Sequence, residues 1–207
     1  HLSSTGPASR GYGPGMRIKL LLLLVTLTTG CRSTISVREL QLSPPTLMVA
    51  QKSPLPLSLI VDGQKVPATL SVLVANEDRG GKLGDTQVFV ERDLKRAFEN
   101  YFSWVEAVPL GKKSDKAGLE VDVRIDRVEI VVVGGGMGFA EMTWSLGMRQ
   151  TGSNEYLFSY AGKSKSEPTQ NPDFALRSAL ENAIADLFHA YTEKDVHATV
   201  LKLGVPG

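Results

Sequence analysis

The chain has 207 residues, of which 42% are hydrophobic and 22% are charged, a composition typical of globular proteins and not of disordered ones. Its 23 Lys and Arg residues nearly balance its 22 Asp and Glu residues, so no strong basic field indicates a nucleic-acid partner. A single Cys excludes an intrachain disulfide framework, and three His residues leave little material for a metal cluster. We therefore expect no cofactor, no metal site and no nucleic-acid ligand.

The N-terminal thirty residues have the pattern of export signals and not of a fold. Residues 1–15 are rich in Gly, Ser and Pro and show no apolar period, so we interpret them as upstream or non-native. Residues 16–30 resemble a secretory signal, since Arg17 and Lys19 precede the apolar run 20–27. This run is far shorter than the roughly 18–20 residues that cross a bilayer, so it predicts export without a transmembrane anchor.

The only cysteine follows this run directly. The small residues before Cys31 resemble the bacterial lipobox. In a lipobox, cleavage after Gly30 would make Cys31 the N-terminal residue of the mature protein, and this cysteine would be acylated, for example with palmitate. Thr28 departs from the pattern, because Leu is usual at that position. The alternative is an ordinary signal peptide with a chance cysteine. Arg32 favours the outer membrane, because Asp at that position is the inner-membrane retention signal in enteric-type sorting.

The first half of the remaining chain predicts strands followed by one helix. We expect a strand within 35–42 and, over 31–56, a lipidated N-terminus that continues as a proline-rich tether. A single domain should then cover 57–203. Its first feature is a predicted hairpin in which residues 57–61 and 66–74 pair across the Asp62-Gly63 turn. An apolar stripe over 86–105 predicts a helix, with Asp85 as its N-cap.

The second half predicts an antiparallel meander and a long helix. Residues 119–133 alternate apolar and polar side chains, and a slip at Arg127 predicts a β-bulge. Two further strands are expected from the alternation in 142–148 and 156–160. The stripe over 174–191 predicts a helix capped by Asp173, and a short element follows at 195–203. The predicted fold class is α+β, a single domain with a mostly antiparallel sheet and two main helices packed on one face.

No pattern in the chain predicts a catalytic, cofactor-binding or metal site. The glycine run 134–136 follows a strand as in a dinucleotide-binding turn, but the next segment alternates like a strand and cannot supply a helix N-terminus. Glu120 and Asp122 could form a catalytic carboxylate pair, but alternation places them on the solvent side of a strand. His189 and His197 lack a third ligand for zinc. Capping or surface roles are expected for both histidines.

Aromatic residues offer the one binding-surface signal in the sequence. Trp104, Trp144, Tyr156 and Tyr160 could line a ligand groove or a partner surface. Core or cross-strand packing is the commoner role of such residues in a sheet, and both interpretations stay open at this point.

Three parts of the sequence together resemble the YajG-type family of bacterial outer-membrane lipoproteins. The first is the lipobox end Thr29-Gly30-Cys31, and the second is the strand Leu70–Val74 with its acidic, Arg-containing loop and Gly84. The third is the order of elements over 119–200, which includes the return strand Tyr160-Ala161-Gly162-Lys163-Ser164. The resemblance is one of pattern over most of 57–200. It implies a cellular location and a fold more than an activity, because no activity is established for the family.

The sequence and the resemblance lead to three hypotheses from different functional classes. The first is a non-enzymatic lipoprotein anchored to the outer membrane through acylated Cys31, facing the periplasm and binding an envelope protein or the cell wall as a scaffold. The second is a periplasm-facing carrier of an apolar ligand or lipid. The third is a hydrolase whose site no motif shows.

Overall fold

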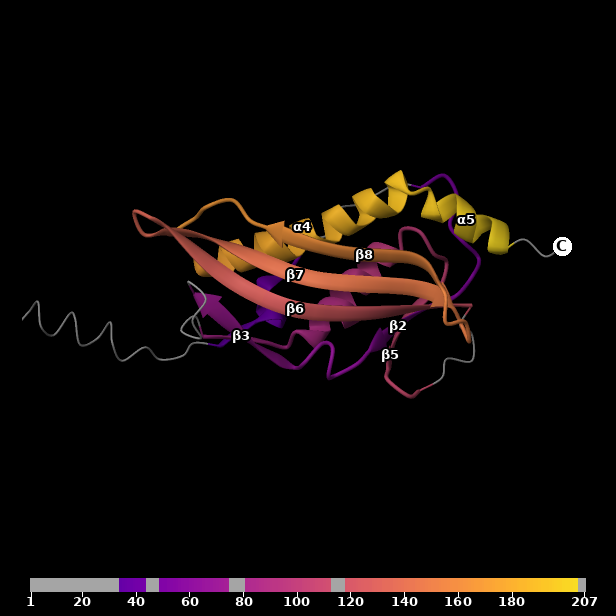
Figure 1. Ribbon diagram of the computed structural model, residues 1–207, viewed down its shortest axis with the longest axis horizontal. Helices are drawn as coiled ribbons and strands as arrows, with labels where there is room; N and C mark the ends of the chain where they lie inside the picture. The colour runs from indigo at the N-terminus through magenta and orange to yellow at the C-terminus, as the bar shows by residue number, and fades with distance from the viewer. Residues whose placement is uncertain (1–33, 44–48, 75–80, 113–117, 205–207) are drawn as a thin grey trace, which may run out of the picture. The chain divides into compact units, whose positions relative to one another are not determined.

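The structure is a computed structural model that describes residues 34–43, 49–74, 81–112 and 118–204. From Thr34 onward the chain forms one compact unit. In chain order its elements are β1 (Thr34–Ser36), α2 (Val37–Leu40), β2 (Leu57–Val61), β3 (Thr69–Val74), β4 (Lys82–Gly84), the π-helical η1 (Phe89–Leu94), α3 (Lys95–Phe98), β5 (Val105–Pro109), β6 (Leu119–Gly134), β7 (Met137–Gln150), β8 (Tyr156–Lys165), α4 (Pro172–Glu193) and α5 (Val196–Leu203). The predicted α+β class is confirmed (Figure 1).

The centre of the fold is the antiparallel meander β6–β7–β8, as the alternation predicts. Strand β6 slips by one residue against β7 between Ile125 and Arg127, which confirms the predicted bulge. The bulge keeps Val128 on the same face as Ile125, so both side chains stay buried. Because the apolar side chains of all three strands point to one face, that face requires a covering layer.

Strands β2 and β3 do not form the predicted hairpin. Both run parallel to β6 along the same edge, β2 beside Leu119–Asp122 and β3 beside Val128–Ile130. The Asp62-Gly63 turn therefore separates two strands that run in the same direction and does not reverse the chain. Within the turn the Val66 amide donates to the Asp62 carbonyl, and the chain continues in its former direction from Thr69. A dipeptide that favours a hairpin is overruled here by the long β6, whose edge accepts both strands.

The rest of the sheet makes it mixed in direction. The path of neighbouring strands is β1–β4–β3–β6–β2–β5, with β7 and β8 continuing from the other edge of β6. The parallel pairs β1–β4, β2–β5, β2–β6 and β3–β6 are short, whereas the antiparallel pairs β6–β7 and β7–β8 are the longest. The free edge of β8 is protected by α4, from which Asn182 and Lys194 donate to its carbonyls.

Helices cover the apolar face of the meander, as expected for two main helices on one side. Figure 1 shows α4 running along the sheet behind β7 and β8. Between α4 and α3 lies an aromatic cluster in which Phe98 meets Phe188 at 5.0 Å and Tyr101 stacks on Phe188 at 4.9 Å between ring centroids. Tyr191 meets Tyr101 at 5.2 Å, and its burial raises the pKa of its hydroxyl group. This cluster joins the two helical segments into one layer.

Several predicted boundaries need correction. Residues 35–42 are not one strand, because the chain turns into α2 after Ser36, and the buried Val37 and Leu40 dock this helix in the core. Segments 34–43 and 49–56 are therefore part of the domain and not a tether. In the second segment, Ser53 is buried and its backbone exchanges hydrogen bonds with the chain around Phe102.

Helix boundaries also differ from the prediction. The helix expected over 86–105 ends at Phe98, because Val105 starts β5. Asp85 is not its N-cap and adopts a positive φ of 54°. Helix α4 is capped by Asn171, whose side chain accepts from the backbone amides of Asp173 and Phe174. At the start of α4 two nearby polar residues, Asn171 and Asp173, could each serve as the cap, and the sequence pattern alone does not choose between them.

Arg92 joins η1 to α2 around a buried carboxylate. Its guanidinium donates to both oxygens of Asp93, at 2.8 and 3.0 Å, and to the carbonyls of Val37 and Arg38 at 3.3 and 3.1 Å. The hydrogen bond with Asp93 raises the pKa of Arg92. Burial raises the pKa of the Asp93 carboxyl, although the guanidinium opposes this effect. At Arg92 the hydrogen bond with Asp93 therefore outweighs the effect of burial on the pKa, whereas at Asp93 burial outweighs the effect of the guanidinium.

Replacing Arg92 by alanine is expected to lower the free energy of unfolding by about 2–3 kcal/mol. The expected loss lies at or below the lower limit for fully buried pairs, because the Arg92 side chain is 34% exposed and water screens it. In Arg92→Ala the Asp93 carboxyl loses its opposing cation, so its pKa rises further above the unfolded value of about 4. Between these two pKa values the native state holds a proton that the unfolded state has released, so stability falls as pH rises.

Urea unfolding of the Arg92→Ala variant between pH 4 and pH 7 measures this effect. The double variant Arg92→Ala/Asp93→Asn is the control, because an amide does not titrate and should show no such loss. A stability deficit that stays constant across this pH range in Arg92→Ala contradicts the argument.

Candidate functional site

The predicted lipidation site Cys31 and the cleavage residue Gly30 lie outside the described residues. The described chain begins at Thr34, the first residue of β1, so Cys31 precedes the sheet by three residues. A chain of that length reaches at most about 10 Å. An acyl group on Cys31 would therefore hold the domain close to its membrane. Among the described helices, none is long and apolar enough to span a bilayer.

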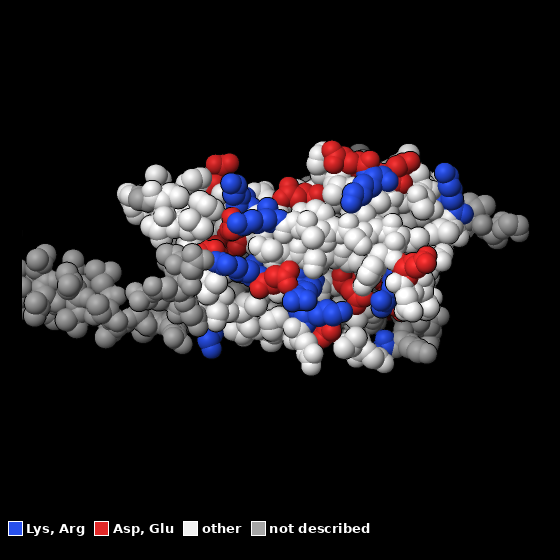
Figure 2. Space-filling model, viewed as in Figure 1, with Lys and Arg blue, Asp and Glu red and all other residues white. Residues whose placement is uncertain are grey.

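The face of the meander that turns away from the helices is open. We call this surface the open face and define it by the outward-pointing residues of β6, β7 and β8. Its floor consists of small residues on two neighbouring strands, Ser145 and Gly147 on β7 and Ser159 and Ala161 on β8. Figure 2 shows this pale floor between groups of charged side chains. Small side chains let another molecule approach the strands closely.

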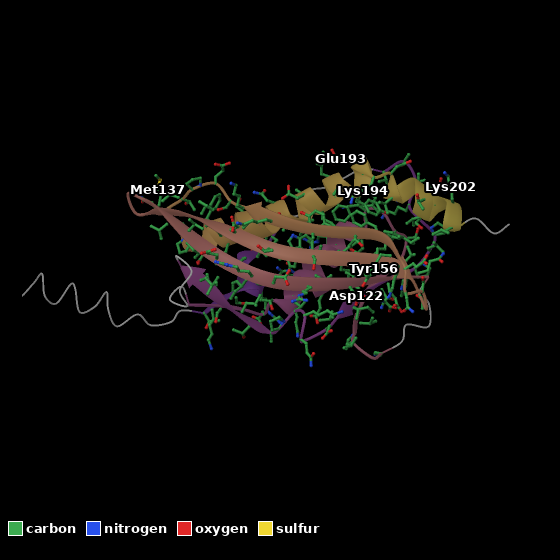
Figure 3. The ribbon with its side chains drawn as sticks, in the orientation of Figure 1. Asp122, Met137, Tyr156, Glu193, Lys194 and Lys202 are labelled. Carbon is green, nitrogen blue, oxygen red and sulfur yellow. The ribbon has the colours of Figure 1, made fainter. Side chains whose placement is uncertain are left out.

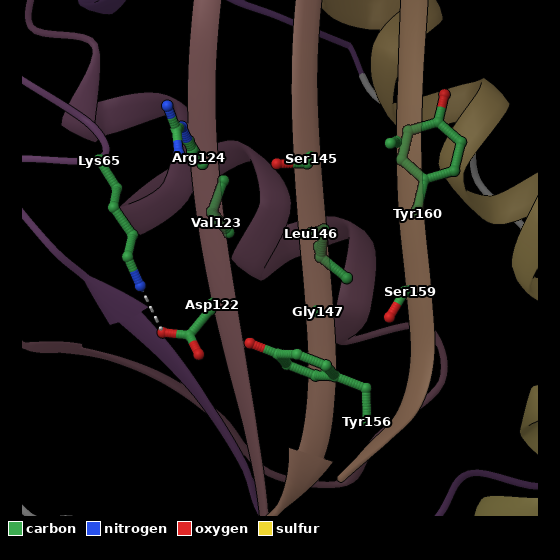
Figure 4. A pocket seen from close by; sticks show the side chains of 11 residues that line it. Lys65, Asp122, Val123, Arg124, Ser145, Leu146, Gly147, Tyr156, Ser159 and Tyr160 are labelled. Atoms are coloured by element: carbon green, nitrogen blue, oxygen red, sulfur yellow. Dashed lines mark hydrogen bonds and ion pairs between the residues drawn. The ribbon is translucent and has the colours of Figure 1, made fainter. Parts of the chain in front are cut away.

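A shallow hollow of about 430 Å³ lies on this floor (Figure 4). Tyr156 projects across it, and its ring occupies the space that a side chain at position 147 would need. Gly147 is therefore the residue that allows the ring to lie flat on β7. The guanidinium of Arg149 lies 6.0 Å from the centroid of the Tyr156 ring, a cation–π distance that helps to hold the ring in place.

Lys65 and Asp122 line the other side of the hollow, and they belong to a cross-strand network of charged side chains that continues to Arg149 and Glu120. Arg149 lies 3.3 Å from a carboxylate oxygen of Glu120 and 3.3 Å from one of Asp122. Lys65 reaches over from the turn between β2 and β3 to within 3.5 Å of Asp122. Opposite charges on neighbouring strands stabilise such a face modestly, and here they also fix where each charge is presented.

Glu120 and Asp122 therefore do not form an isolated carboxylate pair of the kind that acid–base catalysis needs. Each carboxylate has a cationic partner, so both are structural members of the network. The sequence did not identify Lys65 and Arg149 as part of the same site. They lie far from Asp122 in the chain, and only the strand register brings them to it.

The four aromatic residues divide between the two sides of the sheet. Trp144 is fully buried between Phe89 and Tyr160, and Tyr160 is half-buried on the helix side, where burial raises the pKa of its hydroxyl group. Tyr156 and Trp104 are exposed. Core packing is thus correct for Trp144. Tyr160 packs against Trp144 and also borders the open hollow, which the exposed Tyr156 lines as well.

The two histidines do not meet: His189 has the expected surface position, whereas His197 is partly buried and packs against the rings of Tyr101 and Tyr191. His189 is exposed on α4 and lies 3.1 Å from Glu193. His197 lies on α5, with Nε2 2.8 Å from the Gln51 carbonyl and Nδ1 3.4 Å from the Tyr191 hydroxyl. Because a carbonyl oxygen can only accept, Nε2 donates the hydrogen bond to Gln51. In the described part of the chain no three metal-ligating side chains come together.

Comparisons with known proteins identify a shared fold. No protein-family model matches the chain, and no curated protein matches its sequence. A solved structure of a Xanthomonas campestris protein of the DUF330 family matches with a TM-score of 0.53 and 13% identity, covering 79% of this chain and 98% of the other. At this identity the likeness concerns the fold alone. Lipoprotein GNA1162 from Neisseria meningitidis matches with a TM-score of 0.37 and 10% identity, covering 65% of this chain and 98% of the other.

Proposed function

We propose that this protein is a non-enzymatic lipoprotein of the bacterial cell envelope that binds a protein partner through the open face. The observation that carries the proposal is the hollow on that face, where a small-residue floor lies between the Tyr156 ring and a fixed network of charges. Aromatic anchors and pre-positioned charges are the features through which protein interfaces gain affinity and specificity.

Lipid attachment at Cys31 is the second part of the proposal. It is supported by the signal-like segment 16–30 and by the lipobox-like residues before the cysteine. The short span between Cys31 and Thr34 adds a physical reason, because it would keep the domain at the membrane surface. The YajG-type resemblance and Arg32 favour the periplasmic side of the outer membrane as the location.

Photo-crosslinking in cells tests the partner-binding role. A benzoylphenylalanine at Ser159 should give one dominant crosslinked protein, because this residue lies on the floor of the open face. The same probe at His189 is the control, since that residue is exposed on the opposite, helical layer. Adding Tyr156→Ala should reduce the yield at position 159 about tenfold, as expected for loss of an aromatic anchor. Equal background labelling from positions 159 and 189 would count against the proposal.

The carrier alternative is favoured by a different observation. A hollow of about 370 Å³ between the 49–50 segment and α5 is lined mostly by apolar groups, among them Tyr101, Ala198 and Leu201. A lipid chain in this hollow should appear as added mass when the protein is extracted in mild detergent and analysed by native mass spectrometry. A Leu201→Asp variant should then lose the added mass, and its absence from both proteins argues against a carrier.

A further inference from the structure

The hairpin that joins β6 to β7 ends in an exposed apolar tip. We define the hairpin tip as Val132, Val133 and Met137, whose side chains are 58%, 51% and 42% exposed. Between them Gly135 and Gly136 adopt φ values of 60° and 75°, which a tight two-residue turn requires. From Ile130 to Ala140 the chain carries no polar side chain. Contiguous exposed apolar side chains are one signature of a protein-interaction or membrane-contact site.

The tip extends past its neighbours in the described part of the sheet. Strand β3 pairs with β6 only as far as Ile130, and the chain after β8 last bonds to the hairpin where Thr169 pairs with Gly138. Phe174, in the first turn of α4, adds an exposed aromatic ring to the residues that follow Thr169. The hairpin thus ends in a narrow apolar projection.

The chain enters the domain at the same end of the sheet. Thr34 pairs with Lys82, Lys82 pairs with Ser71, and β3 then runs from Ser71 toward the hairpin tip. Strand β1 therefore begins on the tip side and runs away from it. Figure 3 shows Met137 at this end of the molecule, with Lys202 of α5 at the opposite end. Any anchor at Cys31 would hold this end toward the membrane.

We propose that the hairpin tip inserts into the surface of the same lipid bilayer that holds acylated Cys31. This inference rests on the lipid attachment proposed above. The tip is too narrow for a stable protein interface, which needs about 800 Å² from each partner. A lipid surface requires no shape complementarity, and the exposed, uncharged Val and Met side chains of the tip suit the boundary between headgroups and acyl chains.

Two contacts would also fix the orientation of the domain. Thr34 lies three strands away from β6, a lateral distance of about 14 Å, so the point at which the chain enters the domain is separate from the hairpin tip. A domain that is held by a single lipidated residue can still rotate about that residue. A second contact restricts that rotation and presents the same side of the open face to the envelope at all times.

Depth-dependent fluorescence quenching tests the inference. The acylated Cys31 carries no free thiol, so Val133→Cys gives a single site for an environment-sensitive NBD label on the full lipidated chain. Reconstituted into phosphatidylethanolamine–phosphatidylglycerol vesicles, this probe should be quenched at least threefold more by doxyl-labelled lipids than a matched probe at Leu203→Cys. Leu203 is also apolar and exposed, but it ends α5 at the far end of the domain. A second probe at Met137→Cys should behave like the one at position 133.

The outcomes distinguish insertion of the hairpin tip from the proposed lipid attachment at Cys31, because the intact mass of the chain reports acylation independently of the fluorescent probes. If Cys31 is acylated and the probes at 133 and 137 stay as water-exposed as the probe at 203, the hairpin inference is wrong and lipid attachment stands. If the mass shows an unmodified Cys31, the proposed lipid attachment fails, and this inference falls with it.

Discussion

Trp144→Ala is expected to lower the free energy of unfolding by about 3–5 kcal/mol, the range for removing a large buried aromatic side chain. Trp144 is fully buried at the centre of β7, 5.8 Å from the Phe89 ring and 5.3 Å from the Tyr160 ring between centroids. It thereby joins the meander to the helical layer through η1. For a domain of this size the loss corresponds to a decrease in Tm of about 10 °C, measurable by calorimetry.

Two further variants make this test specific. Trp104→Ala removes the same side chain from a site that is 44% exposed, and its cost should stay near 1 kcal/mol or less. Trp144→Phe should also cost less than about 1 kcal/mol. The buried indole Nε1 has no hydrogen-bond partner among the described residues, so removing this donor offsets part of the small cavity that phenylalanine leaves. Equal destabilisation by Trp144→Ala and Trp104→Ala would contradict the central role of Trp144.

The meander around Trp144 is the part of the fold that the sequence predicts best. Its strands alternate over long stretches, and even the bulge between Ile125 and Arg127 is visible as a slip in the alternation. The long helix α4 is similarly visible as an apolar stripe. In these elements local pattern and tertiary burial agree, because each of them buries one face along most of its length.

The first part of the fold could not be predicted in the same way. The Asp62-Gly63 dipeptide favours a hairpin locally, but β6 offers β2 and β3 a continuous edge that only the long-range pairing reveals. The short β1 and α2 are too brief for periodicity to identify. Val37 in α2 is fixed by Arg92, a contact across more than fifty residues. Such non-local contacts decide these elements and leave no periodic signal in the sequence.

The candidate site shows the same limit. Alternation correctly places Asp122 on the outer side of β6, but the turn that carries Lys65 and the strand that carries Arg149 reach it only through the sheet register. Tyr156 owes its position to Gly147, which faces it from the neighbouring strand. Sequence reasoning can thus identify which residues are outward-facing, whereas the grouping of those residues into a site requires the paired strands.

Cys31→Ala is expected to release the protein from the membrane almost completely. Acyl chains contribute about 0.8 kcal/mol for each buried CH₂ group, so two or three chains on Cys31 would hold the protein far more firmly than any other part of the chain. The hairpin tip offers only Val132, Val133 and Met137, which can orient an anchored domain but cannot retain a free one. Fractionation of cells labelled with a palmitate analogue measures both the anchor and its loss.

The matched comparison is a variant that keeps Cys31 and replaces the three tip residues with serine. This variant should stay in the membrane fraction with full acyl labelling, because orientation and retention depend on different parts of the chain. If instead Cys31→Ala stays membrane-bound while the tip variant is released, retention depends on the hairpin, and the cysteine is not the anchor. The Cys31 substitution therefore measures what the acyl chains contribute to membrane retention, and the tip substitutions measure what the hairpin contributes.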